Sequence, residues 1–141
     1  YPVAGEWLTL EEIKTKGRML GDWRIHFALA CGSKSCPTLR AEAYVPDWLD
    51  EQLTMQARSF LSDRQRGLWV DSGALWVSKI FKQYGSDFVY RSHPMTLTPP
   101  VDLLVQALLP YLSPKVADTV KNRKMTLAFL EHDWSLNDVR R

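Results

Sequence analysis

The two cysteines of the chain, Cys31 and Cys36, enclose a short turn rich in glycine and serine, and His26 precedes them. Backbone amides in such a turn can lower the pKa of a thiol and hold an oxyanion, while a histidine can serve as the base for a thiol nucleophile. Near the other end of the chain, Asp133 or His132 could orient that histidine. These residue types fit a thiol-dependent hydrolase or transferase that uses a Cys/His pair.

Three other interpretations of the same residues are open. His26 and Cys31 are an odd number of residues apart, so a strand that contained both would place them on opposite faces. A buried histidine near buried cysteines is then the commoner arrangement. Alternatively, Cys31 and Cys36 form a disulfide across the turn. A structural zinc site normally repeats a close ligand pair and the sequence holds one such pair, so we predict neither a metal nor a cofactor.

The composition is typical of one soluble globular domain. The chain has 141 residues, of which 45% are hydrophobic and 24% are charged, and a chain of this length buries about two-thirds of its unfolded surface. The net charge of +2 and the scattered basic residues do not indicate binding to nucleic acid. No apolar stretch is long enough to cross a bilayer. We therefore predict a single domain over residues 1–141, soluble or peripherally attached to a membrane, with no transmembrane segment.

The elements that must position the cysteines and the histidine belong to an α+β domain, mainly helical with a small antiparallel sheet. Helices are predicted over residues 10–18, 46–62, 80–88, 101–112 and 114–121. Strands are predicted over residues 24–30, 68–70, 74–77 and 126–130. The strongest signals are a Thr-x-x-Glu capping box at Thr9, and apolar residues at helical spacing after Pro46.

The remaining segments are predicted to be irregular. Residues 92–100 hold three prolines and no periodicity, which indicates a loop. Residues 133–137 are expected to dock back onto the domain with Trp134 largely buried, because a large apolar ring is costly to leave in water.

A series of motifs follows the order and spacing of a known family. They lie at residues 24–29, 31–40, 43–44, 49–53, 57–61, 77–81, 84–88, 108–112, 129–130 and 133–138. On these residues the chain, from Leu8 onward, resembles the domain-of-unknown-function family numbered 547. Members carry an earlier tryptophan-rich helix that is missing before Tyr1, and an asparagine where this chain has Ala30. The resemblance implies no settled activity. A start at Tyr1 indicates a processed or excised piece of a larger family domain, with an organellar location as one option, or a chain whose ends are held by a partner.

Two functions of different class follow. The first is a non-catalytic interaction or structural module, an accessory subunit that binds other protein subunits. The two departures from the family pattern favour it, as do chain ends that are expected to be ordered. The six tryptophans are expected to lie mostly in the core, and any exposed one would mark a partner surface. The second is the thiol-dependent hydrolase or transferase, with Cys31, Cys36 and His26 as catalytic candidates and Asp133 as an orienting group. The first interpretation is the preferred one.

Overall fold

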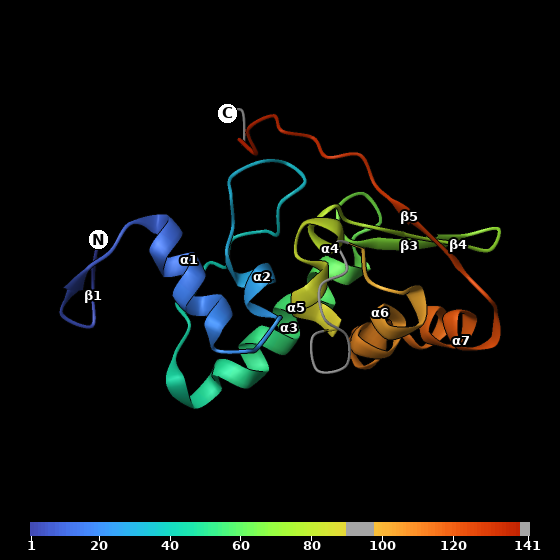
Figure 1. Ribbon diagram of the computed structural model, residues 1–141, viewed down its shortest axis with the longest axis horizontal. Coiled ribbons are helices and arrows are strands. Elements are labelled where there is room, and N and C mark those ends of the chain that lie inside the picture. Colours follow the sequence, from blue (N-terminus) through green and yellow to red (C-terminus); the bar gives the residue numbers. More distant parts are fainter. Residues whose placement is uncertain (90–97, 139–141) are drawn as a thin grey trace.

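The computed structural model describes residues 1–89 and 98–138, and Figure 1 shows how their helices and strands are arranged. The helices are α1 (Leu10–Met19), α2 (Ile25–Ala28), α3 (Leu49–Ser62), α4 (Ile80–Gln83), α5 (Gly85–Val89), α6 (Val101–Leu108) and α7 (Pro114–Asn122), with 3-10 turns η1 (Pro46–Trp48) and η2 (Leu109–Tyr111). The strands are β1 (Pro2–Val3), β2 (Glu6–Trp7), β3 (Leu68–Asp71), β4 (Ala74–Val77) and β5 (Thr126–Phe129). The fold is α+β, as predicted. Within the described residues, no helix combines the length and the apolar character needed to span a membrane.

The larger sheet has the strand order β3-β4-β5. Its hairpin is antiparallel, with Leu68 opposite Val77, whereas β5 runs parallel to β4, with Ala74 opposite Thr126. The sheet is therefore mixed and not purely antiparallel as predicted. Parallel neighbours need a long connection, and the chain between β4 and β5 supplies it through α4 to α7 (Figure 1).

Local sequence signals explain α1 and α3. The backbone N–H of Glu12 donates to the Thr9 hydroxyl at 3.2 Å, and the Thr9 N–H donates to the Glu12 carboxylate at 2.8 Å, which completes the predicted capping box. The helix predicted over 46–62 begins as η1 at Pro46 and continues as α3. The segment predicted as a helix over 80–88 is divided into α4 and α5 at Tyr84.

The strand predicted over residues 24–30 is wrong, because this segment forms α2. Asp22 starts the turn: its carboxylate accepts a hydrogen bond from the Arg24 N–H at 3.0 Å, and its carbonyl accepts one from the Ile25 N–H at 3.2 Å. A single helical turn allows the neighbours His26 and Phe27 both to be buried. A short apolar run does not distinguish a strand from such a turn.

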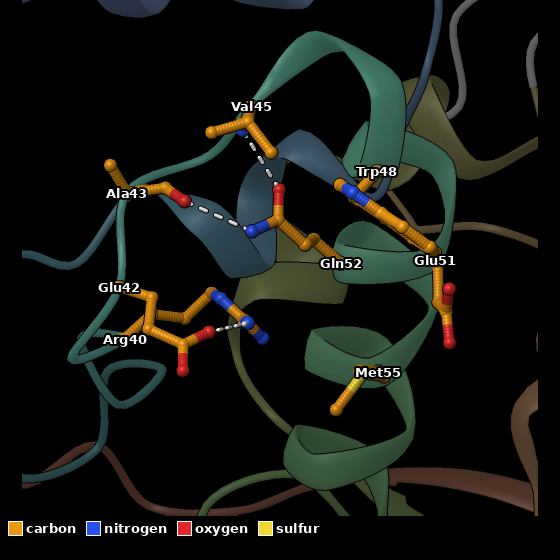
Figure 2. Close-up of a pocket in the computed structure, with 8 residues that line it drawn as sticks. All are labelled: Arg40, Glu42, Ala43, Val45, Trp48, Glu51, Gln52 and Met55. Carbon is orange, nitrogen blue, oxygen red and sulfur yellow. Dashed lines mark hydrogen bonds and ion pairs between the residues drawn. The ribbon is translucent and has the colours of Figure 1, made fainter.

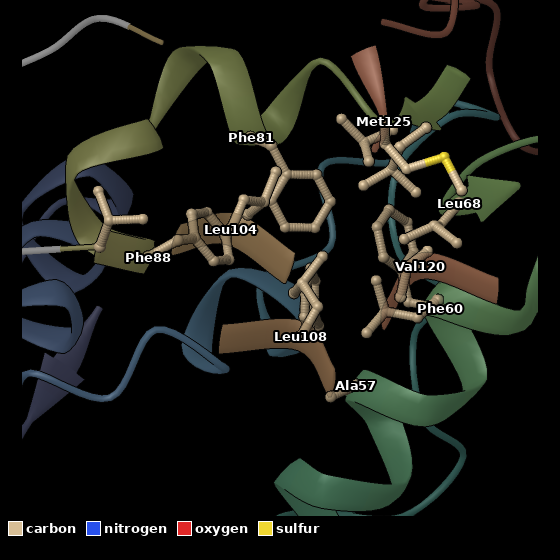
Figure 3. Packing of buried hydrophobic residues seen from close by; sticks show 14 residues of the cluster. Ala57, Phe60, Leu68, Phe81, Phe88, Leu104, Leu108, Val120 and Met125 are labelled. Carbon is tan, nitrogen blue, oxygen red and sulfur yellow. The ribbon is translucent and has the colours of Figure 1, made fainter. Parts of the chain in front are cut away.

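The core is one cluster in which the aromatic ring of Phe27 is fully buried. Figure 3 shows side chains from α3, α5, α6 and the sheet meeting there, including Phe60, Leu104 and Leu108. Phe27 stacks on Phe60 with ring centroids 4.9 Å apart. This cluster fixes α2 against α3 and thereby positions the cysteine turn that follows α2. Of the loop predicted over 92–100, residues 92–97 lie outside the described residues.

Candidate functional site

The cysteine turn is closed by a disulfide between Cys31 and Cys36, whose Cα atoms are 5.9 Å apart. Of the interpretations that the sequence left open for the two cysteines, the structure shows the disulfide. Cys36 is buried, whereas Cys31 is exposed, so the expectation that both are buried is correct for only one of them.

The C-terminal segment covers this turn. The Lys34 N–H donates to the Ser135 carbonyl at 2.9 Å, the Asn137 N–H donates to the Gly32 carbonyl at 2.8 Å, and Ser33 forms an isolated bridge with Leu136. These backbone bonds bear out the prediction that residues 133–137 dock back onto the domain. The side chains of residues 133–137 nevertheless remain exposed.

The predicted burial of Trp134 is wrong, because this side chain is 77% exposed. Its ring lies 4.2 Å from the ring of His132, centroid to centroid. The segment is held by its backbone and not by apolar packing, so the cost of wetting Trp134 does not determine its position.

A cluster of side chains forms where the C-terminal segment meets the cysteine turn. The buried Ser33 hydroxyl lies 3.0 Å from His132 Nε2, 3.3 Å from Cys31 Sγ and 3.2 Å from Cys36 Sγ. The two sulfurs and His132 Nε2 all lie within 4.8 Å of one another. His132 is thus the histidine at the cysteines, whereas the sequence suggested it as an orienting group or as one of several histidines that could join the cysteines at a metal. The one sequence signal for this contact was the expected docking of the segment that follows it.

The structure gives His26 a different environment. The ring is 3% exposed, stacks on Tyr84 with centroids 4.4 Å apart, and places Nε2 at 2.8 Å from the Asp87 carboxylate. Arg18 donates two further hydrogen bonds to Asp87, at 2.6 and 3.0 Å. His26 is therefore part of an ion-pair cluster that joins α1, α2 and α5.

Burial and pairing shift the pKa values of this cluster. Burial is the main cause that lowers the pKa of His26, and the nearby Asp87 carboxylate opposes it only in part. For Asp87, burial raises the pKa, but the hydrogen bonds from Arg18 and His26 outweigh it and the pKa is lowered. The cluster therefore favours an ionised Asp87 and a neutral His26.

Asp133 has a local role in the structure. Its carboxylate accepts hydrogen bonds from the Ser135 N–H at 2.9 Å and from the Ser135 hydroxyl at 2.6 Å, and these bonds lower its pKa. Of the candidates from the sequence, the structure brings Cys31 and Cys36 together, while the carboxylate of Asp133 and the ring of His26 bond to other residues.

A second candidate site, which the sequence did not indicate, is a pocket of about 540 Å³ beside the start of α3, called here the α3 pocket (Figure 2). It is lined by Arg40, Glu42, Ala43, Val45, Trp48, Glu51, Gln52 and Met55. The Gln52 side chain accepts a hydrogen bond from the Val45 N–H at 2.9 Å and donates one to the Ala43 carbonyl at 2.9 Å. This amide ties the preceding loop to α3, so the pocket is formed in advance of any ligand.

Three apolar side chains of the α3 pocket are exposed. Trp48 is 61% exposed, Met55 is 52% exposed and Val45 is 41% exposed. On the loop side, Arg40 lies over the ring of Tyr44 and donates to the Glu42 carboxylate at 3.3 Å. The Nε atom of Arg40 has no hydrogen-bond partner within the described part of the chain.

Comparison with known proteins supports the resemblance over part of the chain. Neither the curated proteins nor the solved structures gave a match. One family model matches residues 10–61 of the chain, a range that holds α1, α2, the cysteine turn and nearly all of α3. Residues 10–61 are thus similar to a family that is described as a protein of unknown function, DUF547.

Proposed function

We propose that this chain is an interaction module that binds another protein subunit through the α3 pocket, as an accessory part of a larger assembly. The observation that carries the proposal is the exposure of Trp48 and Met55 beside a concave surface. Tryptophan and methionine are enriched where proteins bind one another, and a few such side chains supply most of the binding energy.

The spacing of these residues supports a single binding stripe. Trp48, Glu51 and Met55 are separated by three and four residues, so they lie on one face of the helix. Figure 2 shows this face on one side of the pocket, with Val45 and its loop on the other. Because Gln52 already holds the two sides together, little ordering of this surface is needed on binding.

Charge indicates what the partner presents. Glu42 and Glu51 line the α3 pocket, and Asp47 lies in the adjoining η1 turn. Glu51 and Asp47 form no ion pair with any residue of ranges 1–89 and 98–138. The occupant that fits is a protein segment with an apolar side chain flanked by lysine or arginine.

A random-peptide display library, selected on the purified chain, tests this proposal. Selected peptides are expected to carry an apolar residue next to basic residues, and Trp48→Ala is expected to weaken their binding about tenfold or more. Trp134→Ala is the matched control, because Trp134 is also exposed, to 77% against 61% for Trp48, but lies at the cysteine turn. Peptides that bind Trp48→Ala as well as the unsubstituted chain, or selection of no peptide at all, would refute it.

A second candidate function is the thiol-dependent hydrolase or transferase. It is favoured by the contacts of the Ser33 hydroxyl with both sulfurs and with His132, a ring nitrogen of which lies within 4.8 Å of both sulfurs. In this proposal an external dithiol reduces the Cys31–Cys36 disulfide and is itself oxidised to a disulfide. His132 then accepts the proton of the exposed Cys31 thiol, which leaves a thiolate nucleophile.

Alkylation of the reduced chain tests the second proposal. After reduction, Cys31 is expected to react with iodoacetamide at neutral pH several times faster than Cys36, and His132→Gln is expected to remove this advantage. His26→Gln serves as the control, since His26 is bonded to Asp87. Equal rates for the two cysteines, or no effect of His132→Gln, would exclude a thiol activated by His132.

A further inference from the structure

A second, larger pocket lies at the opposite end of α3 from the α3 pocket. It has a volume of about 1000 Å³, at the upper end of the range for small-molecule sites. The C-terminal half of α3, strand β3, turn η2 and the start of α7 all contribute to it, and contacts of α3 with β3 and η2 and of α7 with β3 hold these elements together. It is called here the basic pocket, and Figure 1 shows α7 and β3 at the end of the molecule where it lies.

The charged residues of the basic pocket are mostly cationic. Arg58, Arg64, Lys115 and Arg123 line it. None of the four forms an ion pair with a carboxylate in the described part of the chain. The only carboxylate among the described lining residues is Asp71, which accepts a hydrogen bond from the Ser72 hydroxyl at 2.9 Å. Four unpaired cations around one concavity create a positive potential that attracts anions.

The start of α7 adds to this potential. Ser113 precedes the helix and Pro114 is its first residue, and the Ser113 side chain makes no capping hydrogen bond. The hydroxyl of Ser113 and the first N–H groups of α7 therefore remain available at the pocket, where the helix dipole is positive.

One wall of the basic pocket is aromatic. The Trp69 ring is half-buried on β3, and the Arg64 guanidinium lies 5.4 Å from its centroid. The Trp69 ring also stacks on the ring of Trp76, with centroids 5.9 Å apart and planes inclined by 14°. These two contacts fix the plane of the indole, and a fixed indole edge or face next to arginines suits a ligand with a flat ring.

We propose that the basic pocket binds a small ligand that carries a phosphate or diphosphate group attached to a planar ring. Arg58 and Arg123 pair with the phosphate oxygens, because guanidinium groups bind phosphate through two parallel hydrogen bonds. The Lys115 ammonium adds a single positive charge beside them. The planar ring packs against Trp69. This site is independent of the α3 pocket and of the cysteine turn, so a partner bound at either leaves it open.

Isothermal titration of the full chain at low ionic strength tests the proposal with three probes, namely ADP, inorganic pyrophosphate and adenosine. ADP and pyrophosphate are expected to bind with dissociation constants below about 1 mM, and adenosine more weakly than ADP. Arg58→Gln and Arg123→Gln are each expected to weaken both anionic probes about tenfold. Trp69→Leu is expected to weaken ADP and to leave pyrophosphate unchanged.

Lys121→Gln is the matched control, because it removes one positive charge from the same helix as Lys115 but does not line the pocket. It is expected to leave binding unchanged. The proposal is overturned if neither ADP nor pyrophosphate binds at about 1 mM, or if Lys121→Gln weakens binding as much as Arg123→Gln, which would show diffuse attraction in place of a site. Equal loss of ADP and pyrophosphate binding in Trp69→Leu would refute the role of the ring.

Discussion

The hydroxyl of Ser33 lies 3.0 Å from Nε2 of His132, although 99 positions separate the two residues in the sequence. The same hydroxyl contacts both sulfurs of the disulfide. Ser33 therefore connects the cysteine turn to the C-terminal segment, and its side chain is buried at the junction. Loss of this one oxygen removes partners from three neighbouring groups.

Ser33→Ala is expected to loosen the C-terminal segment. Of the three groups that lose a partner, Cys36 is buried and His132 is half-buried. A buried polar group that loses its hydrogen-bond partner costs about 1–3 kcal/mol, so the free energy of unfolding should fall by an amount in this range. Hydrogen exchange at residues 132–137 reports the local effect. Ser72→Ala, an exposed change at the hairpin turn, is the control, and faster exchange in that variant as well would contradict a specific role for Ser33.

Stability is expected to depend on pH through His26. Its folded-state pKa is lowered, mainly by burial, so the unfolded chain binds the proton more readily. The contribution of His26 is therefore complete above its unfolded pKa of about 6.5 and is lost as the pH falls toward the lowered folded pKa. Denaturant unfolding of the parent chain should show this loss in mildly acidic buffer.

The matched comparison for this pH effect is His26→Gln, which cannot titrate. Its stability should change less between about pH 7.5 and about pH 5.5 than that of the parent chain. The lowered pKa of Asp87 also contributes stability, which is lost at lower pH, below the unfolded value of about 3.9. Parallel curves for the two proteins across the mildly acidic range would contradict the assignment to His26.

Removal of the disulfide is expected to reduce stability by a modest amount. A loop of this length, with a sequence separation of 5 residues, corresponds to about 2 kcal/mol in the chain-entropy description. The double variant Cys31→Ser, Cys36→Ser should show this loss in denaturant unfolding, with no change after addition of a reductant. A parent chain that is as stable reduced as oxidised would contradict the expectation.

Two glycines are expected to respond oppositely to alanine. At Gly67 an added Cβ would lie 1.8 Å from the backbone oxygen of Phe60, which cannot move aside, so Gly67→Ala should destabilise the chain by about 2 kcal/mol or more. At Gly17, inside α1, the nearest atom is the side-chain Cγ1 of Ile25 at 3.3 Å. Gly17→Ala should be close to neutral or stabilising by up to about 1 kcal/mol, because alanine favours the helix. Thermal unfolding of both variants provides the measurement.

Elements with local signals were predicted well. The capping box at Thr9, the turn at Pro46 and the hairpin strands from Leu68 to Val77 are each encoded by neighbouring residues, and the structure places them as expected. The segment around His26 was predicted wrongly, because its strand-like run of apolar residues is too short to determine its conformation.

Contacts between distant segments were the part that the sequence could not give. The parallel pairing of β5 with β4 depends on the path of the intervening helices, and the contact of His132 with Ser33 depends on that pairing in turn. The exposure of Trp134 could not be predicted, because its segment is held by a backbone bridge. Backbone pairing of this kind produces no recognisable pattern of side chains in the sequence. The α3 pocket was missed for a related reason, since Trp48 gives the same sequence signal on a surface as in a core.

The position of the C-terminal segment has a consequence for synthesis on the ribosome. The cysteine turn leaves the exit tunnel early, but the residues that cover it, from His132 to Asn137, are translated about a hundred positions later. One edge of strand β4 likewise stays unpaired until β5 has been synthesised. A nascent chain of this protein therefore carries an uncovered turn and an open sheet edge through most of translation. Both are surfaces that an elongating polypeptide must keep from other chains until its last strand emerges.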